Sequence, residues 1–189
     1  MSAKDKSQTD LFGEAPLKFE YYPVLLPDED GMAAIALLNQ RLIELGVKPS
    51  GLTKLPHVSI DGIICPENDT KVSEGIVEFL SKKDPLLLEF SEMSYFPNPG
   101  GLTLIMPINN AEAIKAFNQE FMNAIGGKIT KLKLHLTLAR YVSREIFDIL
   151  QNSDISFPKN CLCKSVAIYK KQYKAKGAYE VIGKLPFGV

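Results

Sequence analysis

Hydrophobic and polar residues along the first half of the chain follow two alternating patterns. Three segments are rich in residues that favour extended backbone, and they predict the strands Phe19–Leu26, Pro56–Ile64 and Leu86–Tyr95. Between them, apolar residues recur every third or fourth position, and they predict the helices Ile35–Leu45 and Val72–Leu80. Gly46 suits the end of the first helix, and Asp69 or Thr70 can cap the start of the second.

The same order of elements begins again after a break at Pro97–Gly101, where prolines and glycines interrupt any regular element. Four further strands are predicted: Leu102–Ile108, Lys133–Arg140, Leu162–Tyr169 and Tyr179–Leu185. Two further helices are predicted: Ile114–Ile125, which ends at Gly126, and Ile146–Leu150, which Ser143 can cap. The chain is therefore predicted to contain two versions of one β-α-β-α-β unit.

This pattern predicts an α+β fold with bilobal pseudo-symmetry. The helical connections cover one face of each sheet, so two antiparallel-type sheets are expected to face a central cleft with the helices outside. A single domain is expected over residues 17–189, with lobes of roughly 17–96 and 101–189 that could exchange strands. Residues 1–16 are polar and are expected to form a flexible tail.

Composition narrows the function. The chain has 189 residues, 22 basic and 22 acidic, so its formal net charge is zero. A protein that grips long nucleic acid is usually basic, and we therefore expect a small or terminal substrate. The N-terminus resembles no secretory signal, and three cysteines at these spacings fit neither a disulfide framework nor a zinc site. A cytoplasmic monomer with inert, buried thiols is expected.

The chain contains only two histidines, and both occur in the same local pattern. His57 and His135 each fall in the second predicted strand of their half, and each is followed two residues later by a hydroxyl, Ser59 or Thr137. Residues two apart on a strand share a face, so each strand presents an imidazole beside a hydroxyl. Chance gives both hydroxyl matches on the order of 1 time in 100.

This set of side chains suits phosphodiester cleavage. One imidazole can remove a proton from the attacking water or hydroxyl, and the other can protonate the leaving oxygen. The hydroxyls of Ser59 and Thr137 can bind the non-bridging phosphate oxygens. A single histidine of this kind is more often packed or solvated than catalytic, but the duplication favours catalysis. Two histidines without neighbouring carboxylate or thiolate ligands make a poor zinc site, and neither a metal nor a cofactor is expected.

At these residues the sequence resembles the two-histidine phosphoesterase superfamily, which includes the 2′-5′ RNA ligase-like proteins and the cyclic phosphodiesterases. Its signature is a pair of His-x-Thr/Ser tetrapeptides, and His57–Ile60 and His135–Leu138 fit it. The resemblance implies catalysis by His57 and His135, with phosphate contacts from Ser59 and Thr137. It implies RNA ends or nucleotides with 2′,3′-cyclic phosphates, 2′-5′ linkages or ADP-ribose cyclic phosphates as substrates, and ligation as the reverse reaction.

Several further side chains are candidates for the site. Phe96 could stack on a base or belong to the core. Arg140 could reach phosphate if its strand ends there, although a regular strand would turn it away. Lys170 and Lys171 could steer a polyanion or form a solvated turn. Asp61 shares the face of Ser59 in a regular strand, and it lies either near His57 or beyond the cleft.

Two other classes of function stay open. A non-catalytic protein that binds nucleotides or RNA ends could keep the same motifs. Alternatively, the N-terminal tail could carry the main function, because Gln8, Leu11 and Phe12 resemble the peptide with which bacterial replication proteins bind the sliding clamp. The opposing interpretation is that Leu11 and Phe12 pack on this protein's own surface.

Overall fold

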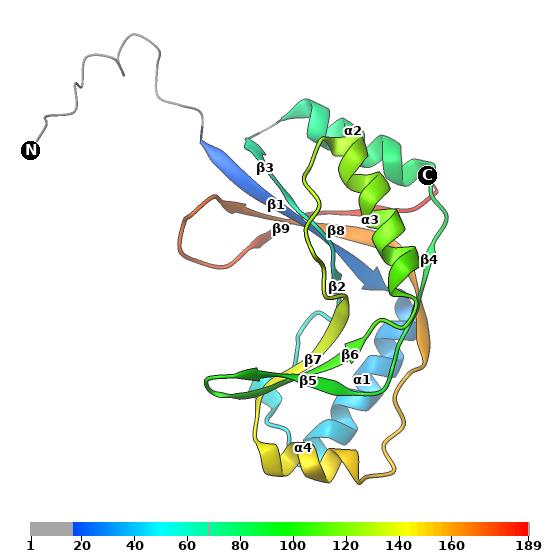
Figure 1. The fold of residues 1–189 in the computed structure, drawn as a ribbon, viewed down its shortest axis with the longest axis vertical. Coiled ribbons are helices and arrows are strands. Elements are labelled where there is room, and N and C mark those ends of the chain that lie inside the picture. The colour runs from blue at the N-terminus through cyan, green and yellow to red at the C-terminus, as the bar shows by residue number, and fades with distance from the viewer. Residues whose placement is uncertain (1–16, 68, 189) are drawn as a thin grey trace, which may run out of the picture.

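A computed structural model describes residues 17–67 and 69–188, and these residues form an α+β fold (Figure 1). The four helices of this part of the chain are α1 Glu29–Glu44, α2 Thr70–Ser81, α3 Ala111–Ile125 and α4 Arg144–Gln151. The strands are β1 Lys18–Pro27, β2 Val58–Ser59, β3 Ile63–Pro66, β4 Leu86–Glu89, β5 Ser94–Asn98, β6 Gly101–Pro107, β7 His135–Val142, β8 Asn160–Gln172 and β9 Glu180–Pro186. The proposed clamp-binding residues Gln8, Leu11 and Phe12 lie outside the described residues.

The helices end close to where the sequence predicts, but α1 begins at Glu29 rather than Ile35, because Asp28 caps its start. Asp69, one of the two predicted caps, accepts a hydrogen bond from the backbone N–H of Val72 at the start of α2. Ser143 caps α4 in the same way. Gly126 ends α3 with a φ of 70°, a backbone conformation in which a side chain would be strained. Each of these helix ends depends on residues within three or four positions of one another, so the sequence alone can predict it.

Two predicted strands are wrong, because each is divided between different partners. The predicted strand Pro56–Ile64 becomes β2 and β3, separated by Ile60–Gly62. The predicted strand Leu86–Tyr95 becomes β4, which pairs with β8, and β5, which pairs with β6. Hydrophobicity continues into both breaks because each link begins with a buried apolar residue, Ile60 or Phe90. A change of pairing partner leaves no hydrophobic signal of its own.

All strand pairs in the described residues are antiparallel, and they form one hydrogen-bonded network in the order β4-β8-β1-β2-β7-β6-β5. β3 also pairs with β1, and β9 pairs with β8. The expectation of two separate sheets is therefore corrected, because Val58 of β2 pairs with Leu136 of β7 and joins the two groups of strands. The two histidine motifs meet at this junction.

Hydrogen bonding crosses between the two halves of the chain. β1 from the first half pairs with β8 from the second, and β6 from the second half pairs with β5 from the first. The order β8-β1-β2-β7-β6-β5 is thus symmetric about the β2–β7 junction. The lobe boundaries at 17–96 and 101–189 stay a prediction.

The hydrophobic core lies on one face of the strands, under the helices. In Figure 1, α2 and α3 lie toward one end of the molecule and α1 and α4 toward the other. Val58 and Leu136 are fully buried, as are Leu25 and Met106 on the flanking strands β1 and β6. Among the described helices, none is both long and apolar enough to cross a bilayer. The opposite face carries a smaller cluster, Val24, Leu26 and Ala167, and Val24 pairs there with Ser59 of the first histidine motif.

Candidate active site

The two histidine motifs lie on neighbouring strands at the centre of the strand order. Antiparallel pairing of Val58 with Leu136 places His57 opposite Thr137 and Ser59 opposite His135. Directly opposed side chains have Cβ atoms about 4.5–5.5 Å apart, and diagonal neighbours such as the two histidines are about 7–8 Å apart. Each imidazole therefore has the hydroxyl of the other motif as its cross-strand neighbour.

All four side chains share one face, which we call the histidine face. Val58 and Leu136, the residues between them, are completely buried in the core. Because strand residues alternate between faces, His57, Ser59, His135 and Thr137 point away from this core, and all four are half-buried. An imidazole pair and a hydroxyl pair are thus collected on one surface.

The two rings are held by the same kind of hydrogen bond. Nδ1 of His57 lies 2.7 Å from the carbonyl oxygen of Leu55, and Nδ1 of His135 lies 2.6 Å from that of Lys133. In both cases the carbonyl belongs to the residue two positions earlier. A carbonyl can only accept, so each Nδ1 must carry the hydrogen. Nε2 of each ring is then the nitrogen left to exchange protons with a ligand.

The surroundings of His57 favour its neutral form. Burial lowers the pKa of His57 from the usual 6.5, and the positive charges of Arg140 and His135 lower it further. The hydrogen bond to Leu55 opposes this shift, because a carbonyl acceptor stabilises the positively charged imidazolium more than the neutral ring. A neutral imidazole with a free Nε2 is a proton acceptor near neutral pH.

An aromatic ring lies beside each histidine. The ring of Tyr169 on β8 lies 6.2 Å from that of His57, and the ring of Phe96 on β5 lies 5.0 Å from that of His135, edge to face. The ammonium of Lys133 lies 5.8 Å from the centre of the Phe96 ring. Phe96, a sequence candidate, is thus brought to the histidines. Tyr169 was not predicted, because only the pairing of β8 with β1 brings it near His57.

The pairing around the two motifs obeys the same symmetry as the strand order. Ser59 pairs with Val24 of β1, and two residues along that strand Tyr22 pairs with Tyr169. In the other half, Thr137 pairs with Ile105 of β6, and two residues along that strand Thr103 pairs with Phe96. Tyr169 and Phe96 therefore occupy equivalent positions, and so do Tyr22 and Thr103.

A β-bulge turns Arg140 toward the histidines. Ile105 pairs with Thr137, but the next residue of β6, Leu104, pairs with Ala139, so β7 contains one extra residue at Leu138. The alternation of faces is reversed beyond the bulge. Ala139 joins the core, completely buried, and the exposed Arg140 returns to the histidine face. A regular strand would have placed it on the other side, so the sequence pattern could not decide its orientation.

The two lysine candidates do not join the histidines. Lys170 lies on the opposite face of β8, where its ammonium contacts Glu67 at 2.5 Å and lies 4.4 Å from the centre of the Phe19 ring. This ion pair raises the pKa of Lys170. Lys171 shares the face of Tyr169, but it lies farther along the strand over the ring of Tyr179.

Of the two interpretations of Asp61, the structure agrees with the one that places it past the end of its strand rather than near His57, and it buries this residue. Its carboxylate accepts hydrogen bonds from the side-chain amide of Asn118 at 2.8 Å and from the backbone N–H and hydroxyl of Thr130 at 3.0 and 2.5 Å. Its own backbone N–H donates to Asn118 at 2.9 Å. Asp61 therefore ties the chain after β2 to α3, and none of these hydrogen bonds involves the hydroxyl of Ser59 or of Thr137.

The described residues contain no group of three or more His, Cys, Asp or Glu side chains that could hold a metal ion. Cys65, Cys161 and Cys163 are buried and unpaired. Burial raises the pKa of Cys161 and Cys163 to about 12, so both thiols are protonated at neutral pH. They are not suited to nucleophilic or metal-binding roles.

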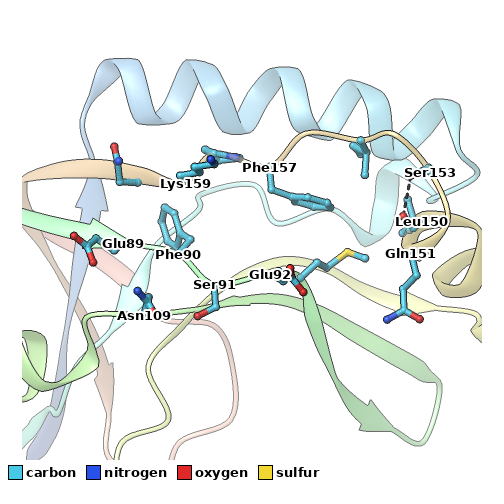
Figure 2. Close-up of a pocket in the computed structure, with 14 residues that line it drawn as sticks. Glu89, Phe90, Ser91, Glu92, Asn109, Leu150, Gln151, Ser153, Phe157 and Lys159 are labelled. Atoms are coloured by element: carbon cyan, nitrogen blue, oxygen red, sulfur yellow. Dashed lines mark hydrogen bonds between the residues drawn. The ribbon is translucent and has the colours of Figure 1, made fainter.

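One cavity of about 890 Å³ lies away from the histidine motifs (Figure 2). Most of its lining comes from β4 and its connection to β5 and from the end of α4 and its connection to β8, and Asn109 is added from the connection between β6 and α3. Glu89, Glu92 and Lys159 are among the lining residues, whereas neither histidine nor either hydroxyl is. The position of this cavity therefore does not indicate where the histidine motifs lie. The predicted cleft between facing sheets stays a prediction.

A family model described as the 2′-5′ RNA ligase superfamily matches residues 32–174, a segment that includes both histidine motifs. The chain belongs to this superfamily. No curated protein is similar enough in sequence to match it.

Solved structures agree with this family in fold. The apo form of E. coli LigT has a TM-score of 0.56 at 10% identity, with 90% of this chain and 98% of that chain covered. E. coli LigT complexed with 3′-AMP gives 0.55 at 11% identity, with the same coverage. E. coli LigT complexed with NADP+ gives 0.54 at 10% identity, covering 93% and 100%. The described residues thus form a LigT-like phosphoesterase fold.

Proposed function

We propose that this member of the superfamily is a phosphodiesterase that acts on RNA ends or nucleotides with a 2′,3′-cyclic phosphate or a 2′-5′ linkage. The observation that carries the proposal is the matched anchoring of His57 and His135, which leaves Nε2 of each ring free on one face. Binding alone does not require two titrating groups held in the same way. An acid–base pair does.

In the proposed hydrolysis, Nε2 of His57 takes a proton from water as the water oxygen bonds to phosphorus. The bond between phosphorus and the leaving ribose oxygen breaks, and Nε2–H of His135 gives that oxygen a proton. His57 is assigned as the base because burial and Arg140 lower its pKa. With the 5′-hydroxyl of a second RNA end in place of water, the same two proton transfers open a 2′,3′-cyclic phosphate: the bond from phosphorus to O5′ forms, the bond to O3′ breaks, O3′ takes the proton, and a 2′-5′ linkage results. The two imidazoles supply both proton transfers, and we therefore propose that no metal is needed.

Three further groups are proposed to hold the phosphate. The hydroxyls of Ser59 and Thr137 flank the two rings and can donate to the non-bridging oxygens. Arg140, turned to the same face by the bulge, can neutralise the charge that grows on them in the transition state. Phe96 offers a ring for a base next to His135.

Nucleotide substrates are supported by the relatives as well as by the site. Structures of E. coli LigT with 3′-AMP and with NADP+ show that this protein of similar fold was crystallised with nucleotides. We extend this to the present chain because its histidines, hydroxyls and aromatic rings are the groups that a nucleotide's phosphate and base require.

A substrate panel tests the proposal. Purified protein is incubated with 2′,3′-cyclic nucleotides, 2′-5′ oligonucleotides and RNA with cyclic-phosphate ends, each with and without EDTA. Turnover of at least one class, unchanged by EDTA and absent in His57→Ala, is expected. Tight binding of these ligands by the wild-type protein without turnover would favour the alternative, a non-catalytic protein that binds nucleotides or RNA ends.

A further inference from the structure

A second aromatic cluster lies on β1, on β8 and at Tyr179, the residue directly before β9. The rings of Tyr22 and Tyr179 lie 5.8 Å apart, and the ammonium of Lys171 lies 4.5 Å from the centre of the Tyr179 ring. The hydroxyl of Tyr179 donates a 2.7 Å hydrogen bond to Glu20. We call Tyr22, Tyr179, Lys171 and Glu20 the tyrosine shelf.

The shelf continues the histidine face on the His57 side. Tyr22 is the cross-strand partner of Tyr169, whose ring lies beside His57. Glu20 and Lys171 are partners two residues farther along the same strands. Four residues separate Glu20 from Val24, the partner of Ser59, so the far end of the shelf lies roughly 14 Å along the strand from the proposed phosphate site.

We propose that the tyrosine shelf binds the second base of a single-stranded oligonucleotide and that Lys171 binds the phosphate beyond it. The inference rests on the proposed function. The oligonucleotide can continue along β1 and β8 only if its scissile phosphate lies at the two histidines. Aromatic faces followed by a cation form the arrangement with which proteins bind single strands without reading the sequence. The preferred substrate is therefore an RNA end of two or more nucleotides rather than a mononucleotide.

The shelf is better suited to a ligand than to the core. The main core under the helices lies on the opposite face. Tyr22 is half-buried against the small cluster of Val24, Leu26 and Ala167, whereas Tyr179 keeps 36% of its surface exposed. Glu20 and Lys171 fix the position of the Tyr179 ring from its edge and face, so little side-chain freedom is lost when a base stacks on it. Burial and Glu20 raise the pKa of Tyr179 to about 12, which keeps its hydroxyl protonated as a donor.

A comparison of the two symmetric halves indicates on which side of the histidines the bound strand continues. On the His135 side, the position equivalent to Tyr22 is Thr103, whose hydroxyl is bonded to the side-chain amide of Asn98. That half therefore offers Phe96 at the first position and a threonine at the second. Of these two equivalent second positions, only Tyr22 on the His57 side has an aromatic ring on which a second base could stack.

Substrate length tests the shelf. Values of kcat/KM are measured for a 2′,3′-cyclic mononucleotide and for cyclic-phosphate di- and trinucleotides with wild type, Tyr179→Ala and Tyr179→Phe. Wild type is expected to prefer the longer substrates. Tyr179→Ala should reduce kcat/KM for these by roughly 5- to 100-fold and leave the mononucleotide value unchanged, because one stacked base is lost. Tyr179→Phe keeps the ring and should retain most of the preference.

Lys171 has a matched control in its neighbour. Lys171→Gln should weaken trinucleotide binding and reduce its dependence on salt, because one phosphate contact is removed. Lys170→Gln removes a similar cation over an aromatic ring from the opposite face of the same strand and should change neither. Equal effects of the two substitutions, or equal loss of mononucleotide and trinucleotide turnover in Tyr179→Ala, would overturn the inference.

A second experiment distinguishes failure of the proposed function from failure of the tyrosine shelf. If wild type cleaves none of the substrates, binding of a non-cleavable trinucleotide is compared between wild type and Tyr179→Ala by fluorescence anisotropy. Weaker binding by the variant still supports the shelf, whereas equal binding overturns it. Circular dichroism of each variant checks that the fold is retained.

Discussion

At the scale of single residues, the two histidines are held alike but surrounded differently. Each Nδ1 donates to a carbonyl two residues earlier, so each ring presents Nε2. His57 is next to Tyr169, and burial first and the charge of Arg140 second lower its pKa. Phe96 lies edge-on to His135 instead. Equal anchoring with unequal surroundings is how one pair of identical side chains can divide into a base and an acid.

Replacement of either histidine is expected to remove turnover. His57→Ala and His135→Ala should each lower kcat by about 100- to 10,000-fold or more, because a member of an acid–base pair is lost. Ser59→Ala and Thr137→Ala should cost less, since Arg140 and the other hydroxyl remain. Steady-state kinetics on the best substrate of the panel measures this, with circular dichroism as the control for folding. Wild-type rates in either histidine variant would falsify the mechanism.

The pH dependence should report the influence of Arg140 on His57. A base must be deprotonated, so kcat/KM is expected to rise with pH through the pKa of His57, which lies below 6.5. In Arg140→Ala this pKa rises, because a nearby positive charge that opposed protonation is gone. The acid limb of the pH profile should therefore move to higher pH in the variant. An unmoved limb with a lower plateau would limit Arg140 to phosphate binding.

At the scale of elements, the shortest strand fixes the first histidine motif, because His57 directly precedes β2 and Ser59 ends it. β2 contains only Val58 and Ser59, yet it pairs with both β1 and β7. The chain beyond it is held by Asp61, which bonds to Asn118 of α3 and to Thr130. Rigid placement of the first motif thus depends on a buried carboxylate that takes no part in the proposed reaction.

Loss of this carboxylate is expected to destabilise the protein. Asp61→Ala leaves the buried amide of Asn118 and the backbone N–H of Thr130 without their acceptor, which costs about 2–4 kcal/mol in the free energy of unfolding. The midpoint of thermal or urea unfolding should fall accordingly. Glu74→Ala, the loss of an exposed carboxylate on α2, serves as the control and should have little effect. Equal stability of the two variants would contradict this role of Asp61.

At the scale of the whole molecule, the two halves of the chain depend on each other. The longest pairing joins β1 to β8, and β5 has β6 as its partner, so each half supplies a strand to the other. The α2 and α3 helices, also from different halves, lie against each other, with Gly75 close to Ala124. A pair of strands without a third partner is marginally stable in water, so such sharing favours a single cooperative unit.

Separated halves are therefore expected not to fold. Residues 17–96 and 101–189, expressed alone, should each show little near-ultraviolet circular dichroism and no cooperative melting. Mixed together, they should recover both signals and the activity that the panel defines. Cooperative melting of either fragment alone at a temperature close to that of the intact chain would show that the lobes follow the sequence halves.

The sequence by itself determined the features that depend on neighbours along the chain. The caps at Asp69 and Ser143 and the glycine at the end of α3 act within a few residues, and their signals are present in the sequence. The histidine and hydroxyl of each motif share a face because side chains alternate along extended backbone. Duplication of the motif then predicted the family, which the match over residues 32–174 confirms.

Tertiary structure alone decided what depends on pairing between distant segments. The break between β4 and β5 follows from a change of partner, and the orientation of Arg140 follows from one extra residue in β7 opposite β6. Tyr169 reaches His57, and Tyr22 reaches Tyr179, only because β8 crosses to β1 and β9 returns beside it. Such contacts are selected by the packing of the whole core, and no local window of the sequence contains the residues that compete for them.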